Sequence, residues 1–146
     1  MQNLAAALVE RVDDVWRRLR MISESQASLR PAVDEWSKKE IVGHLIDSAA
    51  NNHHRFIRAQ QTAELAFPAY EQTVWVKLQA YNHCPWQPLI DFWRLYNLHL
   101  AHTIERIPDD KLDTVCKIGE NAPVTLKFLV EDYLTHLNLH VRQLGF

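Results

Sequence analysis

Residues 125–144 read TLKFLVEDYLTHLNLHVRQL, and their apolar side chains recur at steps of three and four. This spacing places them on one face of an α-helix. Thr125 can cap the N-terminus of the helix, and Gly145 follows its last turn, as terminating glycines do. The segment therefore predicts an amphipathic helix that packs one face into a core. The residues of that face are Leu126, Leu129, Tyr133, Leu137, Val141 and Leu144.

Three further segments show the same period. The first covers residues 3–22, and the polar stretch after it ends the pattern. The second begins at Ser37, which can form a capping box with Glu40, and it runs to about residue 60. The third covers residues 88–107 and has a proline in its first turn, where proline is tolerated.

These segments predict an all-α fold, a four-helix bundle with up-down-down-up order and one domain over residues 1–146. Only 3 glycines and 6 prolines are present, and no convincing pair of strands is visible. The short link after the first helix predicts that helices one and two are antiparallel neighbours. A long crossover, residues 62–88, joins helices two and three and has room for a short helix over residues 71–79.

Composition limits the classes of partner. The formal net charge is −2, so the chain lacks the basic excess typical of nucleic-acid-binding proteins. No apolar run approaches the ~20 residues of a membrane span, and the acidic N-terminal segment does not resemble a signal peptide. Cys84 and Cys116 form neither a CxxC motif nor a disulfide framework. We expect a cytoplasmic protein that binds neither nucleic acid nor membrane.

The helix quoted above contains an HxxxH motif made by His136 and His140. Residues four apart stack on one helical face, so both imidazoles point the same way. A buried polar group without a partner costs about 1–3 kcal/mol, and a divalent metal is one partner that satisfies two imidazoles. Two hydrogen-bonded core histidines, or an exposed pair on a polar flank, would give the same spacing.

A third imidazole strengthens the metal interpretation. His44 lies beside the apolar stripe of the second helix, and three histidines leave one coordination position open, as catalytic zinc sites do. A polar column continues from it through Asp47, Asn51 and Arg55. Asp47 or Asn51 could orient an imidazole, and Arg55 could meet a carboxylate. A solvated helix face is the alternative for all three, and it fits Asp47 better than Asn51.

Two other residues are weaker candidates. His99 borders the apolar face of the third helix and could look into the same interior, either near the metal or as a hydrogen-bonded core residue. Asp132 precedes His136 by one turn, so it could act as a fourth ligand or as an acid or base. Exposure to solvent is the alternative for Asp132.

The ordered set of motifs resembles the DinB/YfiT-like superfamily. The matching stretches are WSKKEIVGHLIDS, AYEQTVWVKLQAYNHCPW, LYNLHLAHTIERIP and HLNLHVRQL, between Trp36 and Leu144. The resemblance implies an up-down-down-up bundle, often dimeric, in which three histidines bind nickel or zinc. The matching positions here are His44, His136 and His140. Members include thiol S-transferases that use bacillithiol, mycothiol-dependent enzymes and proteins assigned as metal-dependent hydrolases.

Three functions fit these observations. The first is a metalloenzyme acting on a small molecule, in which the metal activates water for hydrolysis or a low-molecular-weight thiol for S-transfer. No general base is obvious, which favours transfer. The second is a non-catalytic, dimeric module that binds metal or a small ligand. The third is a structural role in which the histidines satisfy one another through water.

Overall fold

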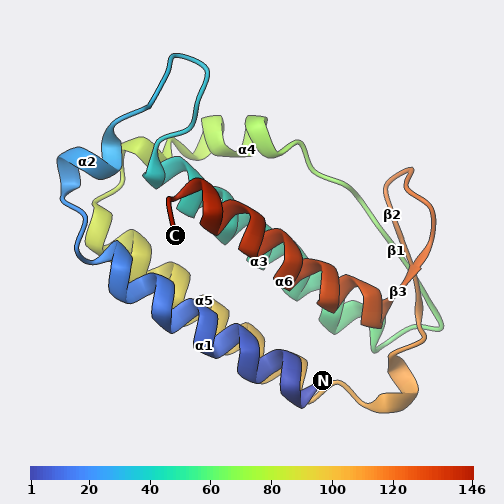
Figure 1. The fold of residues 1–146 in the computed structure, drawn as a ribbon. Coiled ribbons are helices and arrows are strands. Elements are labelled where there is room, and N and C mark those ends of the chain that lie inside the picture. The colour runs from blue at the N-terminus through green and yellow to red at the C-terminus, as the bar shows by residue number, and fades with distance from the viewer.

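The computed structural model describes residues 1–146, and four long helices form its body (Figure 1). They are α1 (Gln2–Leu19), α3 (Lys38–Ala59), α5 (Trp86–Glu105) and α6 (Leu126–Gln143). Each helix begins and ends within two residues of the predicted boundaries, except that α1 ends three residues early. None of the helices is long and apolar enough to cross a bilayer.

The packing order of the bundle differs from one expectation. α1 packs against α5 and α6, and α3 packs against the same two helices, so α1 and α3 lie diagonally opposite. The expectation that the first two helices are neighbours was therefore wrong. The link between them contains an additional helix, α2 (Glu24–Ser28), which packs on α3 and lets the chain cross to the far side.

The crossover between α3 and α5 contains both expected and unexpected structure. The short helix expected near residues 71–79 is α4 (Gln72–Gln79). The strand β1 (Glu64–Phe67) was not expected, and it pairs in parallel with β2 (Val115–Ile118). β2 pairs antiparallel with β3 (Val124–Thr125), which leads directly into α6.

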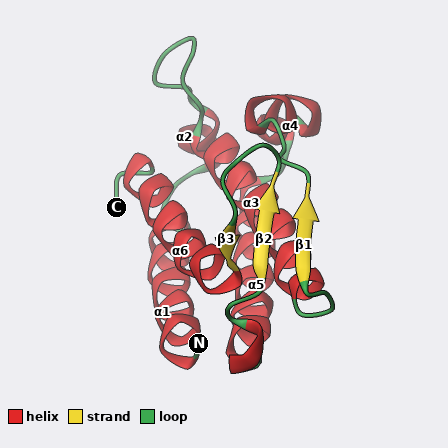
Figure 2. Ribbon diagram, turned by 90° about the vertical axis from the view of Figure 1, so that its right-hand side faces the viewer, coloured by secondary structure: helices red, strands yellow, loops and turns green.

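This small sheet corrects the all-α prediction. Its three strands lie side by side on one flank of the bundle, where β1 contacts α3 and β3 contacts α6 (Figure 2). Cys116 and Ile118 of β2 and Leu65 of β1 are buried, so the sheet closes that end of the core. Strands of two to four residues carry too few positions for a period of two to be recognised.

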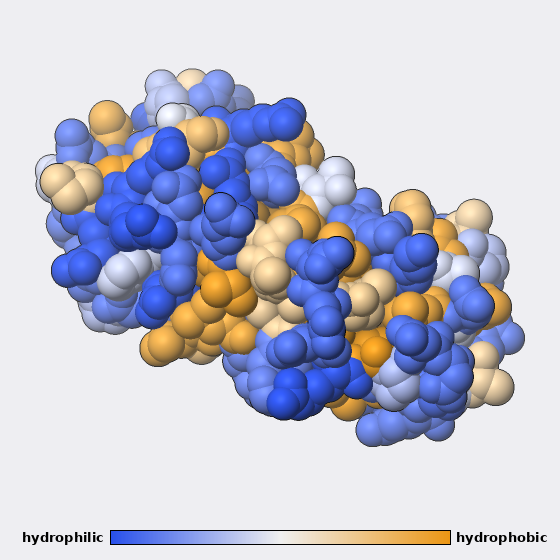
Figure 3. Space-filling view, turned by 60° about the horizontal axis from the view of Figure 1, so that its bottom comes forward, coloured by the Kyte–Doolittle hydropathy of each residue, from blue (hydrophilic) through white to orange (hydrophobic).

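The interior is apolar and continuous along the four helices, with Trp93 and Phe56 among its largest fully buried side chains. Figure 3 shows a mainly hydrophilic face with a band of apolar residues across its middle. The helix α5 leaves Phe92 and Leu95 more than half exposed. The buried set also contains polar residues of α3, among them His44 and Asp47, and these lead to the candidate site.

Candidate metal centre

Two capped helices position three imidazoles at the α3–α6 interface. At the start of α3, Ser37 and Glu40 form the expected capping box, and Ser37 is completely buried. The cap fixes where α3 begins, so His44 points inward and is fully buried. Thr125 caps α6 by accepting a hydrogen bond from the Phe128 amide. His140 is buried and His136 is half-buried, one turn apart on α6.

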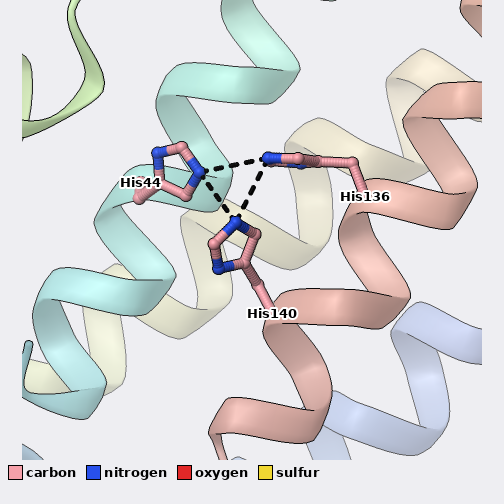
Figure 4. Close-up of side chains that lie close together, drawn as sticks. All are labelled: His44, His136 and His140. Atoms are coloured by element: carbon pink, nitrogen blue, oxygen red, sulfur yellow. Dashed lines mark hydrogen bonds between the residues drawn. The ribbon is translucent and has the colours of Figure 1, made fainter.

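The three Nε2 atoms converge on one point (Figure 4). Nε2 of His44 lies 3.3 Å from Nε2 of His136 and 3.2 Å from Nε2 of His140. The two α6 imidazoles are 3.2 Å apart between the same atoms. Among the His, Cys, Asp and Glu side chains of the chain, these three form the group whose donor atoms could hold one metal ion.

Hydrogen bonds at the opposite ring nitrogens decide which atoms face the centre. Nδ1 of His140 lies 2.8 Å from Oε1 of Gln143, an acceptor, so the His140 proton lies at Nδ1. Nδ1 of His136 lies 3.4 Å from the Ser48 hydroxyl oxygen, which can accept a hydrogen bond from a proton at that nitrogen. His140 therefore directs its Nε2 lone pair at the centre, and His136 does the same when its proton is at Nδ1; a lone pair there is what a metal requires.

Burial favours the neutral form of His44 and His136. Desolvation, followed by the neighbouring His140 and His136, lowers the pKa of His44 from 6.5 to about 3. Desolvation also lowers the pKa of His136, and Asp132 partly opposes that shift. Neutral imidazoles are the ligating form, so the site is ready to bind a cation at neutral pH.

The spacing of the nitrogens fits a metal ion. For metal–nitrogen bonds of about 2.0–2.1 Å in tetrahedral geometry, two ligand nitrogens are separated by about 3.3–3.4 Å. The three separations of 3.2–3.3 Å are close to that value. Little rearrangement of α3 or α6 would therefore be needed to accommodate the ion.

Comparison with known proteins identifies the family of the chain. The family model of the DinB superfamily matches residues 7–144. The chain belongs to the DinB superfamily. No curated protein sequence matches it significantly.

This DinB-superfamily chain is also similar to a solved structure, that of YfiT from Bacillus subtilis. The superposition has a TM-score of 0.83, covers 99% of this chain and 88% of YfiT, and shows 16% sequence identity. YfiT is described as a probable metal-dependent hydrolase with an unusual four-helix bundle topology. At this level of identity the likeness establishes the shared fold.

Two pockets flank the histidines of this DinB-superfamily protein. One has a volume of about 400 Å³ and is lined by His136, Ser48, Arg55 and Asp132, among others. The other has a volume of about 630 Å³ and is lined by His140 and Gln143. Gln72, at the start of α4, lines both. A small molecule in either pocket would therefore lie against one of the α6 imidazoles.

The polar side chains that follow His44 on α3 have different surroundings. Asp47 is buried, contrary to the solvated interpretation, and its Oδ1 accepts hydrogen bonds from the Tyr81 hydroxyl at 2.6 Å and from the Gln79 amide. Burial raises the Asp47 pKa, and these two donors oppose the shift. Asn51 donates to the Asp47 carbonyl oxygen at 2.9 Å. The hydrogen bonds of Asp47 and Asn51 are thus made within α3 and to the α4 region, away from the imidazoles.

The remaining candidate residues lie in two different places. Arg55 and Asp132 line the pocket of His136, although the Asp132 residue is largely exposed. His99 is exposed on α5, where its ring lies 5.1 Å from that of His53 and 6.5 Å from that of His102. The expectation that His99 faces the interior was wrong, because the buried face of α5 is formed by Trp93, Asn97 and Leu100.

Two residues of the site were not among the sequence candidates. Gln143 follows His140 by three positions, and Ser48 follows His44 by four, so each shares a helical face with a histidine. That spacing is the sequence pattern from which Gln143 and Ser48 could have been predicted as site residues. Neither side chain is charged, and uncharged polar residues at such positions are common on helix surfaces.

Proposed function

We propose that this protein is a divalent-metal-dependent enzyme that acts on a small molecule, with His44, His136 and His140 as the metal ligands. The observation that carries the proposal is the convergence of three Nε2 atoms within 3.3 Å of one another. The His140 proton is directed to Gln143 on the far side of its ring, and the Ser48 hydroxyl can accept the His136 proton in the same way. Lone pairs that face one another without a proton between them repel, and a cation at their centre removes that repulsion.

Hydrolysis is the reaction that the site supports best. A bound divalent cation supplies Lewis-acid activation of water or of a carbonyl or phosphoryl oxygen. Asp132 lies one turn before His136 and lines the same pocket, so its carboxylate is placed to accept a proton from a nucleophile. The description of YfiT as a metal-dependent hydrolase supports the same reaction class.

S-transfer from a low-molecular-weight thiol is the second candidate. Asp132 is largely exposed, so the pocket of His136 lacks a buried carboxylate that could act as a base. A thiolate formed at a metal needs less help from a base than water does. The buried Arg55 in the pocket could bind a carboxylate of such a thiol.

Several finer features belong to the same proposal. Nickel and zinc both accept imidazole ligands, and the near-tetrahedral nitrogen spacing supports zinc.

An up-down-down-up order over one domain of residues 1–146 is supported by the course of the chain. The chain runs in one direction through α1 and α6 and in the opposite direction through α3 and α5 (Figure 1). The exposed Phe92 and Leu95 of α5 support a homodimer. A cytoplasmic location without a nucleic-acid partner remains a prediction from composition.

Elemental analysis of tag-free protein tests the metal site. We expect about one divalent metal per chain in the wild type and its loss in His44→Ala and His136→Ala. His102→Ala is the matched control, because His102 is an exposed histidine of α5 and should leave the metal content unchanged. A protein that takes up no zinc or nickel, or that keeps its metal in His44→Ala, would contradict the proposal.

Turnover then separates a hydrolase, a transferase and a non-catalytic binding module. The zinc- and nickel-loaded protein is screened with a panel of esters and amides, and in parallel with thiols plus electrophiles. Ester or amide cleavage that depends on the metal identifies a hydrolase, and thiol-dependent product identifies a transferase. Metal binding without turnover across both panels would identify the non-catalytic binding module instead.

A further inference from the structure

The His136 pocket contains a buried cation without an anionic partner. Arg55, on α3, is 9% exposed and lines this pocket. None of the six ion pairs of the chain includes it, although its guanidinium stays charged at any physiological pH. Its Nε is buried and has no hydrogen-bond partner. A buried charge is unfavourable unless it is paired, so a partner from outside the chain is expected.

The neighbouring contacts hold the guanidinium in place without neutralising it. Nη1 of Arg55 donates to Oδ1 of Asn52 at 3.4 Å, and the guanidinium carbon lies 5.6 Å from the ring centre of Phe67 on β1. Asn52 in turn donates to the Ser48 hydroxyl oxygen at 3.4 Å, and the same hydroxyl contacts His136. The arginine is therefore joined through two polar side chains to an imidazole of the metal site.

The charged residues that line the pocket determine which class of anion binds there best. Glu71 and Asp132 also line it, neither within ion-pair distance of Arg55. Two carboxylates would repel a dianionic phosphate more strongly than a monoanionic carboxylate. The planar fork of arginine binds a carboxylate through two parallel hydrogen bonds.

We propose that the substrate carries a carboxylate, which Arg55 binds while the reacting group lies at His136 beside the metal. This inference rests on the proposed metal-dependent function. Ser48, which contacts His136, is seven residues from Arg55, or about 10–11 Å along the helix axis, and the guanidinium reaches back to Asn52, one turn nearer to Ser48. The carboxylate and the reacting group are therefore several bonds apart, as in a monoester or monoamide of a medium-chain dicarboxylic acid.

Calorimetry with metal-binding probes tests the inference without requiring turnover. The probes are monohydroxamates of straight dicarboxylic acids with three to eight carbons, each paired with its methyl ester, titrated into zinc-loaded protein. We expect the acid of optimal length to bind about tenfold more tightly than its ester, because a charge-assisted pair contributes affinity of that order. Arg55→Met should abolish the preference and leave the ester affinity unchanged.

Arg58→Met is the matched control, because Arg58 is an exposed arginine one turn further along α3 and should keep the preference. Equal binding of acid and ester by the wild type, or a preference that survives Arg55→Met, would overturn the inference. Zinc content is measured on every sample, so that a failure to bind zinc is distinguished from a failure to prefer the carboxylate.

A second measurement does not depend on metal. Glutarate, inorganic phosphate and chloride are compared at equal ionic strength for their effect on the melting temperature of chelator-treated protein. We expect glutarate to raise the melting temperature of the wild type and not that of Arg55→Met. Absence of that rise, or a larger rise with phosphate, would overturn the assignment of a carboxylate.

Discussion

Gln143 is the residue on which the orientation of His140 depends. Its Oε1 lies 2.8 Å from Nδ1 of His140, and this contact fixes both the rotation of the ring and its tautomer. Without the acceptor the proton can move to Nε2, which then cannot ligate. A side chain outside the proposed ligand set thus determines whether the His140 imidazole can act as a ligand.

Replacement of Gln143 by Ala should weaken zinc binding by about 10- to 100-fold, because residues that orient ligands commonly have effects of that size. Competition with a chromogenic chelator measures the affinity. Arg142→Ala is the control, since Arg142 is exposed on the neighbouring position of α6. Unchanged affinity in Gln143→Ala would show that the hydrogen bond does not set the tautomer.

The lowered pKa of His44 predicts how stability depends on pH in the metal-free protein. The folded state has a His44 pKa of about 3, whereas the unfolded chain has the ordinary value of 6.5. Between these values the unfolded state binds a proton that the folded state does not. Stability is therefore complete above pH 6.5 and falls as the pH decreases, by up to about 1.4 kcal/mol per pH unit for one histidine.

Urea denaturation of chelator-treated protein between pH 7 and pH 5 measures this slope. His44→Leu removes the titrating group and should flatten the slope, while His136 continues to contribute because burial lowers its pKa as well. The exposed-histidine variant His54→Leu is the control and should keep the wild-type slope. Identical slopes in wild type and His44→Leu would contradict the prediction.

At the scale of elements, the approach of the Tyr81 segment to α3 depends on a single glycine. A Cβ added at Gly43 would lie 2.1 Å from Cδ2 of the Tyr81 ring, far inside van der Waals contact. The same ring donates its hydroxyl hydrogen bond to Asp47, one turn further along α3. The glycine therefore gives the ring room to reach Oδ1 of the buried Asp47 carboxylate, about one turn from His44.

Gly43→Ala should consequently destabilise the fold by about 1–3 kcal/mol, as overpacking does. In a helix with open space the same change would stabilise by about 0.5–1 kcal/mol, so the sign of the effect identifies the clash. Urea denaturation measures it. In a Tyr81→Ala background the penalty should disappear, and a penalty that persists there would place the clash elsewhere.

The elements also show which parts of the fold the sequence can predict. The long helices were predictable because each repeats its apolar period over several turns and because Ser37 and Thr125 cap two of them. The helix α2 was missed, although Ser23 and Gln26 form a capping box, because five residues contain little more than one turn. The pairing of β1 with β2 joins residues some fifty positions apart, and nothing local encodes it.

For the site, the histidines were predictable and most of their surroundings were not. HxxxH and the capped His44 carry their own chemistry in the sequence, so the three ligand candidates could be named. The hydrogen-bonding partner of Asp47 could not be predicted, because Tyr81 reaches it from another element. Which pocket each histidine lines depends on the packing of α3 against α6 and on the position of α4, and no local pattern encodes these contacts.

At the scale of the whole molecule, the candidate metal site joins two helices that are distant in sequence. His44 lies on α3 and the other two histidines lie on α6, with about ninety residues between them. A ligand that binds only the folded state stabilises it by mass action, by about 2.7 kcal/mol at one hundred times its dissociation constant. For a domain of this size that corresponds to a rise of about 5–11 °C in melting temperature.

Zinc at such an excess should therefore raise the melting temperature of the wild type by about that amount, and chelation should reverse the rise. His44→Ala separates binding across the α3–α6 interface from binding to α6 alone. If the metal joins the two helices, this variant melts at the same temperature with and without zinc. If the HxxxH pair alone holds the ion, the variant retains most of the rise, and the inference that His44 contributes a ligand fails. Differential scanning calorimetry at matched protein and zinc concentrations distinguishes these outcomes, with the exposed-histidine variant His102→Ala expected to behave as the wild type.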